Sequence, residues 1–582
     1  MRNLLVYACG PTLSTSAQLD LNLCINLVHS NTRGGAVSVP HPPRTSGDIR
    51  VVRIGPRLLR GDPRSCPRGS AIAARPLLSQ DPPPSTGRPF KDFALGPVMD
   101  VLDLVEHRNT ELQRALRSTH PFRRCHPLHV AWTRDAVRAY LDARSRWARE
   151  RAEAGDPPTL PVAHEWVVVN ELPGPDRRGA DRYERTAWGR RYATADGSVR
   201  EIWLPSVNSV KEDRSTEEIA AIAGAVHWGV PAVSAFASPY EPVRTARPRQ
   251  CPERVRIIGV GCGDGEFRVL ADWNAEEIER RHRALVVPAV GRLLAATDLT
   301  PGSDCKGCAA LLGCEQPPRV PDLLGVPGPA RPRKRRSVSA TDLRVYGACP
   351  ARFHMTRVLY TREARPESPA IRRGRAVDDL LNERHRAAGP RGCRDLPVDV
   401  DFPDLEPEEA ANARRMLDRH RAVCPLAGLP PGERVLVQPR ITAYDAALDV
   451  VVIADPDLLH TEHGGWIWRE TKALSRGVWE GRPLLETYPQ LALAVLLMAA
   501  GLPGGGGRAR SRVELEVLRG DGVSIEEIDP FDPPTIDQAR EVVSSLAKEW
   551  AVDETYVPAP GRVCVDCEVA RWCPEGPEKG ET

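Results

Sequence analysis

Apolar and polar positions follow the periods of helices and strands from about residue 97 onward. In PVMDVLDLVEHRNTELQRAL and TRDAVRAYLDARSRWARERAEA the apolar residues recur at helical spacing. HEWVVVNEL and RVRIIGVG are apolar runs that predict strands, and YERTAWGRRYATADGSVREIWLP predicts a hairpin. Helices are also predicted in STEEIAAIAGAVHWG and NAEEIERRHRALVVPAVGRLLAA. The first half of the chain is therefore expected to combine strands with helices.

The second half continues the same mixture of elements. Ser339 and Asp342 form a capping-box pattern at the start of one predicted helix, and IRRGRAVDDLLNERHRAA places Val377 and Leu381 on one face of another. PQLALAVLLMAAG predicts an apolar helix that tolerates Pro489 in its first turn. RVELEVLRGDGVSIEEI predicts a hairpin, and TIDQAREVVSSLAKEWAV predicts a last helix. Both halves are thus expected to be of the α/β class.

The stretch from Asp449 to Leu474 carries the strongest candidate chemistry. Two apolar runs, Val450 to Ile453 and Trp466 to Trp468, lie on either side of a turn that contains Gly464 and Gly465. Strand-forming runs joined by a Gly-Gly turn are typical of a hairpin. The sequence therefore predicts that these two runs pair with each other.

Charged residues follow each of the two apolar runs of this predicted hairpin. Glu470 and Lys472 are two positions apart on one strand, so their side chains point to the same face, and Asp457 can converge on that face. Two carboxylates and a lysine at one place can hold a divalent cation and position a water molecule. The alternative is an ordinary surface hairpin, and Asp455 is an alternative to Asp457 as the first carboxylate.

Composition shifts divide the chain into segments. The N-terminal region is rich in Pro, Ser, Arg and Gly with little periodicity, which is typical of disorder or of a tail outside the native protein. A Pro-rich linker ends in a basic cluster from Arg331 to Arg336, which suits a solvated linker or contact with a nucleic-acid backbone. The expected segments are a tail over 1–88, a domain over 89–314, the linker over 315–337, a domain over 338–575 and a tail over 576–582.

Composition also limits location and partners. At 582 residues the chain is long enough for several domains, and its net charge of only +3 confines any basic surface to a local patch. No run reaches the roughly 18 apolar residues of a membrane helix, and MRNLLVYACGPTLSTSA is a poor signal peptide. We therefore expect a cytoplasmic protein with no membrane contact, whose 15 cysteines are reduced thiols or metal ligands.

Six of these cysteines form two matched triplets with the spacing C-x2-C-x5-C. One triplet closes each half of the chain: Cys305, Cys308 and Cys314, then Cys564, Cys567 and Cys573. Cys349, which precedes a proline, is the natural fourth ligand for the second triplet, whereas Cys125, Cys251 and Cys262 remain open as candidates for the first. Four thiolates bind zinc or an iron–sulfur cluster, and the absence of a second C-x2-C pair favours iron–sulfur.

The matched triplets belong to a longer internal repeat. GVGCGDG matches VLRGDG, STEEIAAIAGAVHWG matches ETYPQLALAVLLMAAG, and DGSVREIWL matches GGWIWRETKAL, all in the same order. In this alignment Glu201 stands at the place of Glu470 and Trp203 at the place of Lys472, with no counterpart of Asp457. The first half is therefore expected to be a degenerate copy that lacks the catalytic charges.

Taken together, the motifs of the second half resemble a known family. SATDLRVYGACPARFH, GRAVDDLL, ADPDLL, RETK, YPQLALA and the closing CVDC with Cys573 are similar to the PD-(D/E)XK nuclease superfamily, in the branch of RecB-like and CRISPR-associated exonucleases with a four-cysteine iron–sulfur cluster. The resemblance covers about residues 338–575. It implies a restriction-endonuclease-like mixed sheet flanked by helices, present here as two tandem copies of which the first is degenerate.

The resemblance also implies roles for single residues. Asp457 and Glu470 would ligate Mg²⁺ or Mn²⁺, Lys472 would orient or deprotonate the attacking water, and Gln490 would contact DNA. The branch often has a His ligand where this chain has Asp378, and a carboxylate suits Mg²⁺ at least as well. A 4Fe-4S cluster, or zinc as the alternative, would be held by Cys349, Cys564, Cys567 and Cys573, with Cys305, Cys308 and Cys314 at a second cluster or zinc site.

These expectations define two functional hypotheses. The first is a metal-dependent deoxyribonuclease, an exonuclease on single-stranded or end-containing DNA that serves repair, recombination or defence, with a helicase or similar protein as partner. The second is a non-catalytic DNA-binding scaffold with nuclease-like modules. Retention of Asp457, Glu470 and Lys472 together favours the enzyme, because a scaffold has no need of all three.

Overall fold

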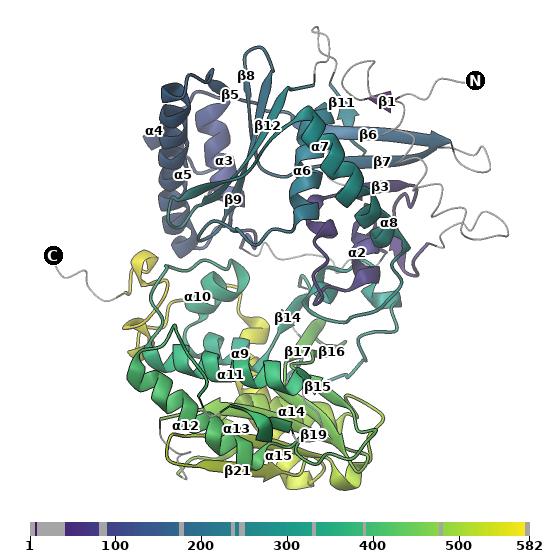
Figure 1. The fold of residues 1–582 in the computed structure, drawn as a ribbon, viewed down its shortest axis with the longest axis vertical. Coiled ribbons are helices and arrows are strands. Elements are labelled where there is room, and N and C mark those ends of the chain that lie inside the picture. Colours follow the sequence, from purple (N-terminus) through teal and green to yellow (C-terminus); the bar gives the residue numbers. More distant parts are fainter. Residues whose placement is uncertain are drawn as a thin grey trace.

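The structure is a computed structural model in which each half of the chain forms a lobe (Figure 1). In Figure 1 the purple-to-teal first half lies above the green-to-yellow second half, and both contain sheets flanked by helices. No helix in the part of the chain described is long and apolar enough to cross a membrane. The described residues are 6–7, 41–80, 90–173, 180–233, 239–243, 251–328, 333–387, 392–397, 399–475 and 481–576.

The first lobe contains two larger sheets. Its five-stranded sheet has the order β13-β12-β9-β8-β5, and its six-stranded sheet has the order β11-β10-β6-β7-β3 with β1 paired to β6. The strands of the first sheet are β5 (Thr159–Pro161), β8 (Arg190–Thr194), β9 (Val199–Ser206), β12 (Arg254–Gly261) and β13 (Phe267–Asn274). Those of the second are β1 (Val6–Tyr7), β3 (Val51–Ile54), β6 (Glu165–Pro173), β7 (Ala180–Thr186), β10 (Val230–Val233) and β11 (Glu241–Pro242), while β2 (Thr45–Ser46) and β4 (Leu78–Ser79) form a separate pair.

The second lobe has a five-stranded and a three-stranded sheet. Their orders are β15-β18-β19-β20-β21 and β14-β17-β16. The five strands are β15 (Val435–Val437), β18 (Leu458–Glu462), β19 (Gly465–Ala473), β20 (Arg512–Leu518) and β21 (Val523–Ile528). The other three are β14 (Arg336–Val338), β16 (Ile441–Asp445) and β17 (Val450–Ala454).

The two five-stranded sheets have the same topology. In each, one central pair is parallel, β9 with β12 and β19 with β20, and every other pair is antiparallel. A helix connects the two parallel strands in both lobes, as a parallel pair requires. The neighbouring sheets agree as well, because β3 pairs parallel with β7 as β14 does with β17.

Helices cover these sheets in both lobes. In the first lobe they are η1 (Pro56–Leu59), α2 (Pro67–Ala73), α3 (Gly96–Glu106), α4 (Leu112–Arg117), α5 (Pro127–Glu153), α6 (Thr216–Trp228), α7 (Ala275–Arg281), η2 (His282–Val286), α8 (Val287–Ala295), η3 (Ser303–Gly307) and η4 (Leu311–Gly313). In the second they are α9 (Ala340–Ala348), α10 (Pro350–Phe353), η5 (His354–Val358), α11 (Pro369–Ala387), η6 (Gly392–Asp395), α12 (Pro407–Val423), α13 (Leu484–Thr487), α14 (Pro489–Ala499), η7 (Arg508–Arg510), α15 (Pro533–Val552), η8 (Arg562–Cys564) and η9 (Ala570–Trp572). The predicted cap at Ser339 is confirmed, since its hydroxyl accepts a hydrogen bond from Asp342 N at 3.2 Å.

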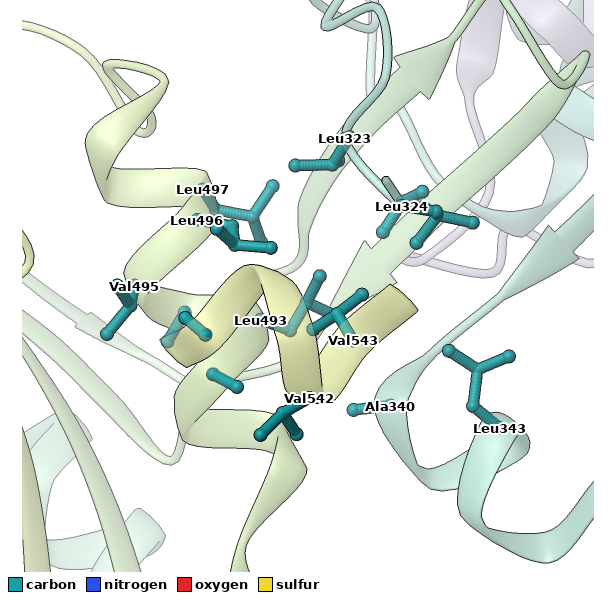
Figure 2. Packing of buried hydrophobic residues seen from close by; sticks show 14 of the residues in the cluster. Leu323, Leu324, Ala340, Leu343, Leu493, Val495, Leu496, Leu497, Val542 and Val543 are labelled. Carbon is teal, nitrogen blue, oxygen red and sulfur yellow. The ribbon is translucent and has the colours of Figure 1, made fainter. Parts of the chain in front are cut away.

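Helix α14 forms the centre of the second lobe's core. All its residues from Leu491 to Met498 are buried, as expected for a helix that is apolar on every side. Figure 2 shows side chains of this helix near Val542 and Val543 of α15. Leu323 and Leu324, from the segment predicted to be a solvated linker, belong to the same core (Figure 2). The linker prediction is therefore wrong for these residues.

The basic cluster after this segment also contacts the protein itself. Arg333 and Arg336 donate hydrogen bonds to main-chain oxygens at the C-terminal end of α15, and Arg336 lies over the Trp550 ring at 3.8 Å. Arg335 pairs with Asp449 at 2.6 Å. Unpaired carbonyls at a helix end favour such cationic partners. The described part of the cluster thus caps a helix instead of presenting a free basic surface.

The prediction of a tail over residues 1–88 is wrong for residues 41–80. This segment contains β3, whose Val51, Val52 and Ile54 are buried, and α2, which packs on α8. Its Pro- and Arg-rich composition concealed short elements that are stabilised by contacts with residues far away in the sequence. The predicted disorder of 8–40 and 81–88 concerns positions outside the described residues.

The hairpin predicted around Gly464 and Gly465 is present but has a different first strand. Strand β19 pairs with β18 (Leu458–Glu462), whereas the apolar run Val450 to Ile453 forms β17 in the neighbouring sheet. Pro456 lies between β17 and β18, where its missing N–H interrupts pairing. The chain therefore changes sheets just before Asp457.

The cysteine-bearing ends of the two halves pack reciprocally. Cys349, Cys567 and Trp572 of the second half share a core with α5 of the first, and Trp572 Nε1 donates to Asp135 Oδ2 at 3.1 Å. In turn, Cys305 and Leu311 of the first half pack on Tyr444, Val451 and Ile453 of β16 and β17, which belong to the second half. Each half thereby completes the core of the other.

Buried histidines lie where α5 meets the second half. Burial, followed by repulsion from neighbouring histidines, lowers the pKa of His354 from 6.5 to about 3, and burial lowers that of His129 to about 4. Neither ring nitrogen of His354 has a hydrogen-bond partner among the described residues. His354 instead stacks on Tyr556 with a centroid distance of 4.6 Å.

These depressed pKa values predict acid sensitivity of the folded chain. Below about pH 6.5 the unfolded chain protonates these histidines while the folded chain does not, so the free energy of unfolding should fall toward pH 4, by up to about 1.4 kcal/mol per pH unit for each histidine. Urea unfolding between pH 7.5 and 5 measures this slope. The variant His354→Phe should reduce this slope by up to about 1.4 kcal/mol per pH unit, the effect of one proton, whereas the exposed-site control His120→Gln should not. Equal slopes in the wild type and both variants would contradict the low pKa of His354.

Candidate active site and cysteine clusters

Asp457 is positioned by the end of the β18–β19 ladder. The last ladder pair is Leu458 with Arg469, and beyond it Asp457 Oδ2 accepts a hydrogen bond from the main-chain N–H of Thr471 at 2.7 Å. The carboxylate therefore takes the place of the next strand pair. Asp455 lies elsewhere, since its exposed side chain pairs with Arg440 at 2.9 Å. This geometry selects Asp457 over Asp455 as the carboxylate beside β19.

Glu470 and Lys472 lie on the same face of β19, as their spacing predicts. Glu470 is buried, and its Oε1 accepts a hydrogen bond from Trp468 Nε1 at 3.1 Å. Lys472 Nζ lies 3.5 Å from Glu470 Oε2 and 3.7 Å from Asp457 Oδ2. The predicted trio is therefore assembled at one place, with the lysine between the two carboxylates.

Asp378 adds a third carboxylate from helix α11. Gln438 Nε2 donates a hydrogen bond to its Oδ2 at 3.2 Å. Burial and then repulsion from Asp457 raise the pKa of Asp378 to about 6, an effect that the Lys472 charge partly offsets. The electrostatic coupling to both residues indicates that Asp378 faces the same site.

Three carboxylates share one lysine in this partly buried site. Burial raises the pKa of Glu470 to about 7, with Lys472 opposing and Asp457 adding to the shift. Burial disfavours the charged form of Lys472, but Glu470 and Asp457 outweigh it and raise the lysine pKa. With its three carboxylates ionised and one lysine protonated the site carries a net negative charge, which fits a divalent cation with oxygen ligands.

Gln490 lies at the start of α14, half buried and next to Pro489. No hydrogen bond or ion pair joins it to Asp457, Glu470 or Lys472 among the residues described. Its predicted contact with DNA stays a prediction.

The corresponding position in the first lobe differs from the predicted alignment. In both sheets the chain turns at Gly-Asp-Gly after the second strand of the parallel pair. In the first lobe the residue two positions before this turn, Gly261, pairs with Ser206. In the second lobe the equivalent residue, Leu518, pairs with Ala473. Ser206 is thus the counterpart of Ala473. Counting back three residues places Trp203, and not Glu201, at the position of Glu470.

The same register identifies the other two counterparts. Pro205 stands in place of Lys472, and Arg190, which pairs with Trp203, stands in place of Asp457. The Arg190 guanidinium forms ion pairs with Asp103 and Glu106 of α3. The first lobe therefore has Arg, Trp and Pro where the second has Asp, Glu and Lys.

The four cysteines predicted for the second half meet at one small cavity. It is lined by Cys349, Cys564, Cys567 and Cys573. Cys349 caps α10, its Sγ facing Arg352 N at 3.5 Å, and the Sγ of Cys564 faces Gly561 N at 3.4 Å. Backbone N–H groups directed at sulfur are a feature of sites in which the thiolates hold a metal cluster.

The first triplet also has a candidate fourth cysteine, Cys66. A cavity of about 680 Å³ is lined by Cys66, Cys305, Cys308 and Cys314. Cys66 caps α2, its Sγ facing Gly69 N at 3.2 Å, and it precedes a proline as Cys349 does. The candidates Cys125, Cys251 and Cys262 are absent from this cavity lining. The Cys-Pro pair at the start of a helix was the signal that could have found Cys66.

The two groups of four cysteines, called quartets below, are Cys349, Cys564, Cys567 and Cys573 in the second half and Cys66, Cys305, Cys308 and Cys314 in the first. The sulfur atoms in both quartets are widely spaced. A tetrahedral zinc ion with Zn–S bonds of about 2.3 Å would bring its sulfurs to within about 3.8 Å of one another. Among the described residues, three or more ligand atoms approach within 4.8 Å of one another in one group only, and that group contains none of these eight cysteines. Both quartets are thus more open than a single zinc ion requires.

A partly buried Asp–Glu–Lys set beside a parallel strand pair is an arrangement that can hold a divalent cation. Residues 337–574 match the family model of the PD-(D/E)XK nuclease superfamily. The match includes the Asp457 site and the closing cysteine triplet, and the predicted fold class is confirmed for this part of the chain. A comparison with curated proteins finds none that matches.

The geometry predicts that the second lobe binds Mn²⁺ through Asp457 and Glu470. Even the loss of a residue that only orients a ligand typically weakens metal binding 10–100-fold. Asp457→Asn and Glu470→Gln should therefore each weaken Mn²⁺ binding at least about tenfold, measured by electron paramagnetic resonance of free Mn²⁺. Asp455→Asn is the matched control, and an equal loss in this variant would place the metal elsewhere.

Proposed function

We propose that this chain is a metal-dependent deoxyribonuclease whose second lobe carries the active site. The observation that supports this most is the convergence of Asp457, Glu470 and Lys472, with Asp378 facing them from α11. The superfamily match over residues 337–574 supports DNA as the substrate. As in the sequence resemblance, we infer exonuclease action on single-stranded or end-containing DNA in repair, recombination or defence.

In this proposal the three carboxylates hold one or two Mg²⁺ or Mn²⁺ ions. Such a cation lowers the pKa of a bound water and offsets the charge on the phosphate. Lys472 Nζ donates hydrogen bonds that orient the attacking water, and its charge stabilises the negative charge that develops on the phosphate oxygens. The water loses one proton to solvent as its oxygen bonds to phosphorus, the bond from phosphorus to one sugar oxygen breaks, and that oxygen takes up a proton from solvent, which leaves a phosphate monoester and a free hydroxyl. Gln490 contacts the DNA strand.

We further infer that both cysteine quartets hold iron–sulfur clusters. The main-chain N–H groups directed at the Sγ atoms of Cys349, Cys564 and Cys66 support metal-bound thiolates at both places. Four thiolates per site provide the usual ligand set of a 4Fe-4S cluster. Because each quartet packs against the opposite half of the chain, the clusters would also stabilise the junction between the lobes.

The first lobe is proposed to be a degenerate copy of the second. The shared strand order, the shared parallel pair and the second Cys-Pro helix cap support duplication. Trp203 and Arg190 stand where the second lobe has the carboxylates Glu470 and Asp457. This loss keeps a second candidate in view, a scaffold that binds DNA without cleaving it and works with a helicase or nuclease partner.

A cleavage assay separates the enzyme from the scaffold. We expect Mg²⁺- or Mn²⁺-dependent cleavage of end-labelled DNA that falls by at least about 10²-fold in Lys472→Ala, because the charge that stabilises the developing negative charge is lost. Lys548→Ala, which removes an exposed lysine on α15, is the control. Unchanged cleavage in Lys472→Ala would reject this site, and DNA binding without cleavage by the wild type would favour the scaffold.

Iron analysis tests the clusters independently of cleavage. Anaerobically purified protein should be brown and contain about eight irons per chain, if each quartet holds a four-iron cluster. Cys564→Ala and Cys66→Ala should each remove about half of this iron, whereas Cys262→Ala, at a buried thiol outside both quartets, should remove none. A colourless wild type with zinc at both quartets would overturn the cluster assignment.

A further inference from the structure

Four buried side chains behind the candidate active site converge on one point. His385 comes from α11, Cys393 from η6, His420 from α12, and Cys424 from the residue that ends α12. One ligand atom from each lies within 4.8 Å of the other three, and all four residues are buried. We propose that these residues form a structural zinc site.

The interatomic distances fit a tetrahedral ion. His385 Nε2 and His420 Nε2 are 3.2 Å apart, and Cys424 Sγ lies 3.9 Å from His385 Nε2. Two nitrogens bound to one zinc at 2.0–2.1 Å with tetrahedral geometry would be about 3.3 Å apart. Two thiolates with two imidazoles are a frequent ligand set for structural zinc, and thiolate ligands exclude the harder Mg²⁺. The group is also too compact for an iron–sulfur cluster.

A second layer of contacts fixes the orientation of one imidazole. His420 Nδ1 donates to Glu516 Oε1 at 2.7 Å, and both residues are buried. With its proton on Nδ1, His420 directs the lone pair of Nε2 toward the other three ligands. A carboxylate behind a metal-bound histidine is the usual way to set that tautomer and to raise the basicity of the ligand.

A disulfide between Cys393 and Cys424 explains this arrangement less well. The main-chain N–H of Cys393 faces Cys424 Sγ at 3.3 Å, so the two cysteines are close enough to interact. A disulfide, however, would leave two buried imidazole nitrogens directed at sulfurs that no longer carry charge. A cation accounts for all four side chains at once.

The zinc site would position part of the active site. Asp378 precedes His385 by seven residues on α11, two helical turns along the same face. At the other side, Glu516 contacts Thr471, whose Oγ1 lies 3.3 Å from Glu516 Oε2 and whose main chain binds Asp457. The ion would therefore fix α11 and α12 against β19 and β20. The assignment of the metal does not depend on nuclease activity.

Metal analysis of the intact chain tests the proposal without any cleavage assay. We expect about one zinc per chain in the wild type, in addition to iron, and loss of that zinc in His385→Ala/Cys424→Ser with the iron retained. Cys262→Ser is the matched control for loss of a buried thiol and should keep the zinc. Zinc that remains in the double variant would overturn the proposal, as would a zinc-free wild type from zinc-supplemented cells with Cys393 and Cys424 recovered as a disulfide.

X-ray absorption spectroscopy of the zinc in the wild type covers the case in which the double variant does not fold. The extended fine structure should fit two sulfurs at about 2.3 Å and two nitrogens at 2.0–2.1 Å. A shell of four sulfurs would instead place the zinc in a cysteine quartet and reject this site. Mass spectrometry after alkylation of the native protein provides a third measurement, because zinc should protect Cys393 and Cys424 until a chelator is added.

Discussion

The alternation of side chains along β19 is the constraint on which the chemistry of the second lobe depends. Glu470 and Lys472 point to one face of this strand, while Arg469 and Thr471 point to the other. The first face carries the candidate active site, and the second contacts Glu516 on β20. A shift of one residue in the pairing of β19 with β20 would exchange the two faces and destroy both. The parallel register is therefore as important to the proposed function as any single catalytic side chain.

The two lobes depend on each other through their cysteine-bearing ends. Cys567 and Trp572 of the second lobe pack into a core that includes α5 of the first. Cys305 and Leu311 of the first lobe pack into a core that includes β17 of the second. In this arrangement the first lobe covers apolar surface that the second lobe would otherwise expose. Its interior is well packed, with Trp203 buried at the register position where the second lobe has Glu470.

The sequence predicted features whose determinants are local and failed where contacts are distant. Helix α14, the cap at Ser339 and the common face of Glu470 and Lys472 follow from periodicity within a few residues. The position of Asp457 beside β19 was also predicted. The apolar run before it was assigned to the wrong sheet, because apolar content does not determine which strands pair. The alignment of Glu201 with Glu470 was wrong by two positions, since matching motifs by eye ignores the register that hydrogen bonds impose.

Candidate metal ligands were missed for the same reason. Cys66 lies in a Pro- and Arg-rich segment far from Cys305, and only the fold brings the two together. His385, Cys393, His420 and Cys424 are separated by 8, 27 and 4 residues, a spacing that matches no familiar motif. Such ligand sets become visible only after two helices have been packed side by side.

The capping of α15 by Arg333 and Arg336 has a consequence for how this chain can be divided. These arginines lie in the segment between the halves, yet their hydrogen bonds end on a helix near the C-terminus. A cut before residue 337, where the superfamily match begins, would remove both caps and expose the faces of the second half on which Cys567 and Val451 lie. The superfamily match and the packing of the second half therefore have different boundaries, because residues before 337 cap α15 and cover faces of the second half.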